Sequence, residues 1–144
     1  MKNIFIAVAC LGAALLSGCV TAPPSDATTI QGTWKGQEVR DGQAAASWLT
    51  LVGNELEFRG ADHNEWYKGT YTLNEKTDPK QFIGTITFSP ASAYVGKTVN
   101  AIYELIPGPQ DQATLILTGN EPGDPQMPSG FADHHARQIV FTRD

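Results

Sequence analysis

Short runs rich in β-branched and aromatic residues, separated by Gly, Pro, Asn and Asp, fill the chain after Ile30. This pattern is typical of an all-β domain, because strands favour such side chains and tight turns need residues that tolerate unusual backbone angles. We predict eight strands and no helix of ten or more residues. The predicted strands are Gly32–Val39, Ser47–Val52, Glu55–Arg59, Tyr67–Asn74, Phe82–Ser89, Val99–Ile106, Ala113–Thr118 and Arg137–Arg143.

Two of these runs alternate between apolar and polar residues, which predicts one buried and one solvated face. Leu56 and Phe58 alternate with charged residues, and Tyr71 and Leu73 alternate with polar ones. Gly53-Asn54 has the composition of a two-residue hairpin turn, because both residues tolerate a positive φ. Eight strands joined by sequential hairpins can close into a barrel without exposed edges. The predicted fold class is therefore all-β, an eight-stranded antiparallel up-and-down barrel.

The first 18 residues have the pattern of a bacterial lipoprotein signal peptide. Lys2 supplies the positive charge, an apolar run follows, and Leu16-Ser17-Gly18-Cys19 ends the run at small residues and a cysteine. The run is shorter than the ~20 residues that cross a bilayer. An ordinary secretory signal with a chance cysteine is the alternative. We expect lipid attachment at Cys19.

This leader predicts the domain organisation and the location of the protein. Residues 1–18 are expected to be removed, 19–29 to form the lipidated cysteine and a flexible tether, and 30–144 to form the barrel domain. Val20 follows the cysteine in place of an aspartate, which favours the outer membrane. The expected location is the cell envelope, with the lipid-anchored domain facing the periplasm.

Charge and cysteine content exclude several classes of protein. The net charge is -5, and no basic stripe is present, which argues against nucleic acid as a partner and against electrostatic docking on anionic lipid. Cys10 lies in the leader and Cys19 is the lipidation site, so the mature domain has no disulfide and depends on its core for stability.

A Gly-x-Trp at Gly32 and Trp34, with Arg143 on the last predicted strand, is the short signature of lipocalins. In such a barrel the glycine lets the strand bend, the tryptophan plugs one end, and the arginine stacks on its ring.

The chain from Ile30 to Arg143 also resembles the uncharacterised lipocalin-like domain family of bacterial, planctomycete-type proteins. That family has no established activity, so the resemblance implies a fold rather than a function. Its members often carry a cysteine where this chain has Ile116 and Leu117. The resemblance rests on Ile30–Lys35, Lys68–Leu73, Asp78–Lys80, Tyr94–Thr98, Ile102–Leu105, Thr114-Leu115, Pro128–Phe131 and Val140–Arg143.

Inward side chains of an eight-stranded barrel form either a filled core or the wall of a small ligand cavity. No inward-facing arginine or lysine is evident, so a neutral apolar molecule fits better than a fatty-acid carboxylate. We predict a lipid-anchored envelope protein that binds a small apolar ligand and uses no cofactor. The candidate ligand-lining residues are Phe58, Tyr71, Phe82, Phe88, Tyr103, Leu105 and Leu117.

The alternative is a protein-binding or inhibitor module of the cell envelope with a filled barrel. Its surface would include Trp66 and Tyr67 as an exposed pair and the long segment Gly119–Ala136. That segment is also a candidate lid, although we favour a loop in which Met127 and Phe131 pack down over the core.

The three histidines lie in acidic loops, at His63 and at His134-His135. Together they could supply zinc ligands, but their spacing matches no known motif and the adjacent pair would point to opposite faces of an extended chain. We therefore favour solvated loops and no metal. No nucleophile elbow, paired cysteines or glycine-rich phosphate loop is present, so we predict no enzymatic activity.

Overall fold

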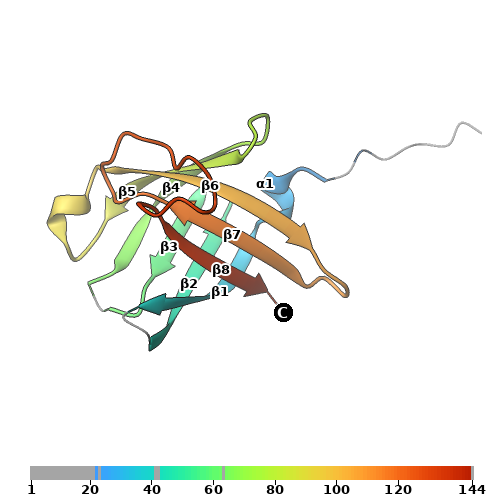
Figure 1. Cartoon of the computed structure of the whole chain (residues 1–144), viewed down its shortest axis with the longest axis horizontal. Helices are drawn as coiled ribbons and strands as arrows, with labels where there is room; N and C mark the ends of the chain where they lie inside the picture. The colour runs from blue at the N-terminus through green and yellow to red at the C-terminus, as the bar shows by residue number, and fades with distance from the viewer. Residues whose placement is uncertain (1–21, 23, 41–42, 63, 144) are drawn as a thin grey trace, which may run out of the picture.

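The computed structural model describes residues 22, 24–40, 43–62 and 64–143, which form a closed β-barrel (Figure 1). Each strand pairs antiparallel with the next, and β8 pairs with β1, so the predicted eight-stranded up-and-down barrel is confirmed. A short helix, α1 (Asp26–Thr29), precedes the barrel, and a 3-10 helix, η1 (Ser92–Tyr94), lies between two strands. The strands are β1 (Gly32–Arg40), β2 (Gln43–Val52), β3 (Glu55–Arg59), β4 (Trp66–Asn74), β5 (Lys80–Phe88), β6 (Thr98–Pro107), β7 (Ala113–Gly119) and β8 (Arg137–Arg143).

All eight predicted strands form, and the largest difference in their bounds is at the start of β2. That strand begins at Gln43 and not at Ser47, because Ala44, Ala45 and Ala46 pair with residues of β1. Alanine has a weak strand propensity, and pairing with a neighbouring strand overrides it.

The predicted hairpin turn between β2 and β3 is also confirmed. Val52 pairs directly with Glu55, which leaves the two residues Gly53 and Asn54 in the turn. Gly53 has a φ of 62°, a backbone conformation that glycine adopts without steric cost.

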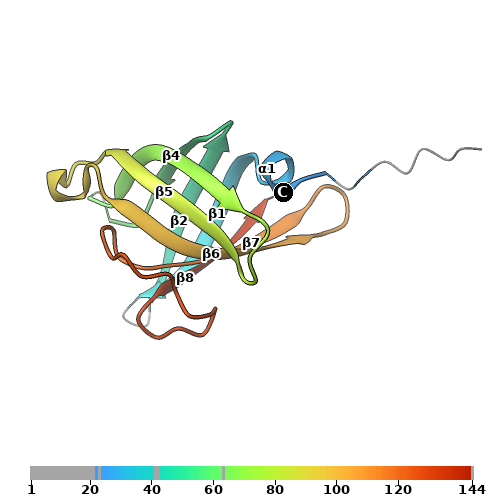
Figure 2. The same ribbon diagram turned by 90° about the horizontal axis from the view of Figure 1, so that it is seen from above.

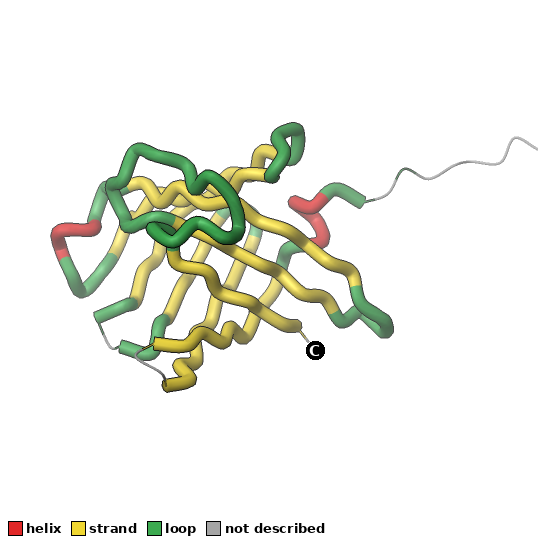
Figure 3. Tube along the Cα trace, viewed as in Figure 1, coloured by secondary structure: helices red, strands yellow, loops and turns green. Residues whose placement is uncertain are grey.

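Successive connections alternate between the two ends of the barrel, as the up-and-down order requires. Figures 2 and 3 show α1 near one end and the loop 120–136 near the other. We call the end with α1 the closed end and the other the open end. The closed end carries the turns 53–54, 75–79 and 108–112, and the open end carries the loops 60–65, 89–97 and 120–136.

Trp34 plugs the closed end. Its side chain is fully buried, and its indole Nε1 donates a hydrogen bond to the carbonyl of Ile30 at 2.8 Å. The Arg143 guanidinium lies 4.6 Å from the centre of the Trp34 ring and donates hydrogen bonds to the carbonyls of Thr29 and Gln31. The stacking expected between these two side chains is therefore present.

Residues Asp26–Thr29, which we expected to belong to the flexible tether, instead form α1 and contact the barrel. The Asp26 carboxylate lies 2.6 Å from Lys80 Nζ and accepts a hydrogen bond from the Tyr103 hydroxyl at 2.9 Å. Burial, and then this hydrogen bond to a carboxylate, raises the pKa of Tyr103 well above its ordinary value. The ordered domain thus begins before residue 30, and a chain that starts at Thr21 contains α1, every strand and the buried core.

Phe88 lies on the outside of the barrel, so its prediction as a ligand-lining residue was wrong. The alternation of β5 places Phe82 and Ile86 inside and would place Phe88 with them. A β-bulge changes this pattern, because Gly69 pairs with Ile86 whereas Lys68 pairs with Phe88. The extra residue in β5 turns the next side chain to the other face, and Phe88 is 46% exposed.

Candidate functional site

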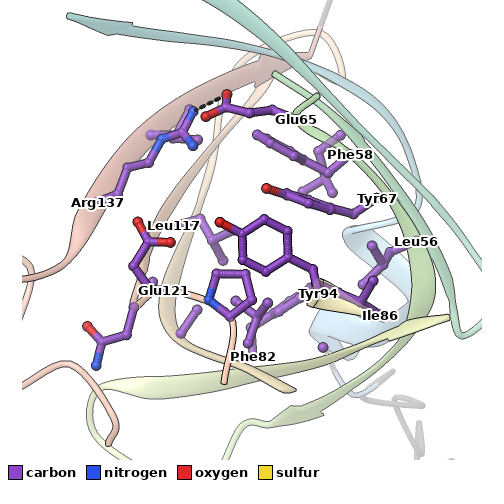
Figure 4. A pocket seen from close by; sticks show the side chains of 18 of the residues that line it. Leu56, Phe58, Glu65, Tyr67, Phe82, Ile86, Tyr94, Leu117, Glu121 and Arg137 are labelled. Carbon is purple, nitrogen blue, oxygen red and sulfur yellow. Dashed lines mark ion pairs between the residues drawn. The ribbon is translucent and has the colours of Figure 1, made fainter. Parts of the chain in front are cut away.

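A cavity of about 660 Å³ occupies the half of the barrel nearest the open end (Figure 4). Its inner wall is apolar and is formed by side chains from most of the strands. This volume lies within the ~300–1,000 Å³ typical of small-molecule sites. The inner wall includes Leu49, Leu56, Phe82, Ile86, Leu117 and Ile139.

Three aromatic rings form one side of the cavity. Phe58 and Tyr67 are stacked with their centres 5.9 Å apart, and Tyr94 meets the Tyr67 ring edge-on at 5.7 Å and 88°. Phe58 and Tyr67 come from paired positions on β3 and β4, whereas Tyr94 is supplied by η1 in the loop before β6. The cavity thus has two perpendicular ring surfaces near its mouth.

Arg137, the first residue of β8, also lines the cavity. Its Nε donates to Glu38 Oε2 at 2.6 Å, a second guanidinium nitrogen contacts Glu38 Oε1, and Glu65 Oε2 lies 3.6 Å away. The guanidinium carbon is also 5.6 Å from the centre of the Phe58 ring. The Glu38 side chain is 4% exposed and that of Arg137 is 33% exposed, so the carboxylate is shielded from water and the guanidinium only in part.

We missed Arg137 as an inward cation, although the sequence contains the signal. Ile139 and Phe141 are buried, and Arg143 covers Trp34, so every second residue of β8 faces the interior. Extending this alternation back along the strand places Arg137 inside as well.

The Tyr67 hydroxyl lies in a buried position near acidic groups, which favours its neutral form. Burial first, and then the neighbouring Tyr94, Glu65 and Glu121, raise the pKa of Tyr67 to about 12, against an opposing effect of Arg137. Burial and the nearby carboxylates both disfavour the phenolate.

We expect Tyr67 to make stability depend on pH in the alkaline range. Its folded pKa of about 12 exceeds the unfolded value of 10.0, so its stabilising contribution is complete below pH 10 and is lost as the pH rises through 12. Unfolding titrations at a series of alkaline pH values, followed by tyrosinate absorbance, would measure this loss of stability. The Tyr67→Phe variant keeps the ring and should lose less stability over this range than the unmodified chain. An equal loss in both proteins would contradict the assignment.

Of the seven candidate ligand-lining residues, Phe58, Phe82 and Leu117 line the cavity. Leu105 is partly buried and packs against the core without lining the cavity. Tyr71 and Tyr103 also face inward but do not reach it, because the closed end is filled. The Tyr71 ring stacks on Phe82 at 5.0 Å, and its hydroxyl donates to the carbonyl of Gly53.

Trp66 and Tyr67 do not form an exposed pair. As neighbours on β4 they point to opposite faces, and Tyr67 lines the cavity. Trp66 lies on the outer surface, where the Arg59 guanidinium is 4.7 Å from its ring centre and Phe88 packs edge-on at 5.0 Å.

The loop 120–136 forms part of the cavity mouth through its two ends. Asn120, Glu121 and Pro122 line the cavity at one end of the loop, and His135 and Ala136 line it at the other.

The middle of this loop is held by hydrogen bonds. Asp133 accepts bonds from the backbone and hydroxyl of Ser129 and from the backbone of His135, and these bonds lower the pKa of Asp133 to about 2. Met127 and Phe131 are half-buried but do not line the cavity.

His134 and His135 are both exposed, and His63 lies outside the described residues. Within the described part of the chain, no three His, Cys, Asp or Glu side chains are grouped so that they could hold a metal ion.

Comparisons with protein-family models, with curated proteins and with solved structures each gave no match. The described residues contain no helix with the length and apolar character needed to cross a membrane.

Proposed function

We propose that this chain binds a small, mainly apolar molecule inside the barrel. The observation that carries the proposal is the cavity of about 660 Å³, with an apolar inner wall and polar groups at its mouth. Pockets that hold small ligands usually have this combination, in which the apolar wall provides affinity and a few polar groups fix orientation.

The proposal includes attachment to the cell envelope through lipid on Cys19, with the barrel facing the periplasm. Cys19 lies outside the described residues. The described chain enters the barrel at α1, next to the closed end, whereas the cavity lies at the opposite end. A barrel tethered in this way presents its cavity away from the anchor.

The first test is native mass spectrometry of the chain from Thr21, expressed in the envelope compartment, with organic extraction of any bound molecule. Binding of the neutral fluorescent probe N-phenyl-1-naphthylamine provides a second measurement. We expect a stoichiometric apolar adduct or saturable probe binding.

A variant that fills the cavity should weaken this binding. Leu117→Trp should weaken probe binding by about tenfold or more, because the larger ring occupies space that the ligand needs. Val140→Trp is the matched control, since Val140 is 39% exposed on the neighbouring strand and does not line the cavity. Its binding should be unchanged. Equal affinity of the probe for both variants would place the probe outside the barrel. If the chain carries no adduct and does not bind the probe, the proposal is contradicted.

A protein-binding module remains the second candidate function. The outer surface favours it, because Trp48 is 43% exposed and Phe88 is 46% exposed. That alternative was predicted to have a filled barrel, so the cavity supports ligand binding more strongly. If the cavity binds no apolar molecule, this outer surface is where a partner should be sought.

A further inference from the structure

The charges around the cavity mouth are mainly negative. Asp62, Glu65 and Glu121 line the cavity, and within the described part of the chain Arg137 is the only lining residue with a guanidinium or ammonium group. That guanidinium already binds both carboxylate oxygens of Glu38. With Glu38 included, the described residues at this site carry four carboxylates and one permanent positive charge.

Glu121 is the carboxylate best placed to meet a ligand. It is exposed, and its side chain makes no hydrogen bond or ion pair within the described residues, whereas its backbone carbonyl accepts a bond from Asp124. Figure 4 shows the hydroxyl groups of Tyr67 and Tyr94 pointing toward the side of the cavity where Glu121 and Arg137 lie. A head group at this position would contact a carboxylate and two phenol groups.

The aromatic rings provide a second attraction for a positive charge. Tyr67 and Tyr94 meet at 88°, and Phe58 stacks behind Tyr67. Perpendicular ring faces beside a carboxylate bind ammonium groups through cation–π and ionic attraction.

A ligand carboxylate would not fit here. It would be repelled by Glu65 and Glu121. Two nitrogens of the Arg137 guanidinium already bind Glu38, whose side chain is 4% exposed, so drawing this cation toward a ligand carboxylate would weaken its pairing with Glu38. Leaving a buried carboxylate without its cation is strongly unfavourable.

We infer that the preferred ligand is an amphiphilic organic cation, with an apolar body in the inner cavity and an amine or quaternary ammonium group between Glu121 and the rings of Tyr67 and Tyr94. This inference rests on the proposed function, because it assigns the head group of the molecule that the cavity binds.

Three probes with the same tail test the head group separately from the cavity. Decyltrimethylammonium, 1-decanol and decanoate are compared by displacement of N-phenyl-1-naphthylamine from the chain that starts at Thr21, below the concentrations at which they form micelles. We expect the cation to bind about tenfold more tightly than the alcohol, and decanoate to bind most weakly.

Two variants should remove this preference. Glu121→Gln and Tyr94→Leu should each weaken binding of the cation by about fivefold and change binding of 1-decanol by less than about twofold. Glu104→Gln is the matched control for lost negative charge, because Glu104 is exposed on β6 and does not line the cavity. It should leave all three affinities unchanged.

The outcomes separate the two proposals. Binding of 1-decanol or decanoate as tight as that of the cation would overturn the inference and leave the apolar cavity as the ligand site. The same result follows if Glu121→Gln and Glu104→Gln weaken the cation equally. If none of the three probes displaces the fluorescent molecule and that molecule itself does not bind, the proposed function fails.

Discussion

Replacing Trp34 with alanine should lower the free energy of unfolding by about 4 kcal/mol, since large-to-small changes of buried aromatic residues cost about 3–5 kcal/mol. Trp34 is fully buried, so the change leaves a void at the closed end. It also removes the donor to the Ile30 carbonyl and the ring beneath the Arg143 guanidinium. Urea unfolding followed by far-ultraviolet circular dichroism would measure the loss.

Trp48→Ala is the matched control for this experiment. Trp48 is 43% exposed on the outer face of β2, and changes at such positions usually cost less than about 1 kcal/mol. The two variants therefore remove the same side chain from a buried position, at Trp34, and from an exposed position, at Trp48. Similar losses of stability in the two variants would contradict the role of Trp34 as the plug of the closed end.

The second large effect is expected at the ion pair between Arg137 and Glu38. Arg137→Met should lower the free energy of unfolding by about 3 kcal/mol, because it leaves a buried carboxylate without its cation. The double variant Glu38→Met with Arg137→Met removes both charges and should recover much of that loss. Urea unfolding of the two single variants and the double variant gives the coupling energy.

A second ion pair provides the control. The Arg59 Nε lies 2.6 Å from Glu57 Oε1, but the two side chains are 57% and 31% exposed. Water screens such a pair, so Arg59→Met should cost no more than about 1 kcal/mol. If Arg137→Met costs no more than Arg59→Met, or if the double variant is no more stable than its less stable single variant, the Glu38 carboxylate does not depend on this guanidinium.

The strands and their order could be predicted from the sequence because they depend on local signals. Alternation in runs such as Glu55–Arg59 fixes which residues face inward, and Gly53 supplies the backbone conformation that a two-residue turn needs. Once each strand pairs with the next, the barrel follows from the number of strands. The stacking of Arg143 on Trp34 was predicted from the resemblance to the lipocalin signature.

The cavity was less predictable, because an inward side chain lines it only at the correct height in the barrel. Tyr71 and Phe82 both face inward and stack on each other, yet Phe82 lines the cavity and Tyr71 does not. The strand pattern gives the direction of each side chain but not how far the filled closed end extends.

Two further features depend on contacts between distant parts of the chain. Asp26 reaches Lys80 and Tyr103, which are 54 and 77 residues away, so nothing near Asp26 in the sequence indicates that α1 contacts the barrel. The bulge at Lys68 and Gly69 likewise arises between two strands. The bulge moves Phe88 from the inner to the outer face, and the alternation of residues in β5 itself does not indicate this.

The pairing of β1 with β8 has a consequence for the order of folding. Lys35 pairs with Thr142, and Gly36 pairs with Phe141, so this seam joins the two ends of the domain. Contacts between such distant segments carry a large loop-closure entropy and slow the folding of a chain. During synthesis β1 precedes its partner by almost the whole domain, and its outer edge stays unpaired until β8 arrives. Arg143 is in that last strand, so the cover over Trp34 is completed only when the barrel closes.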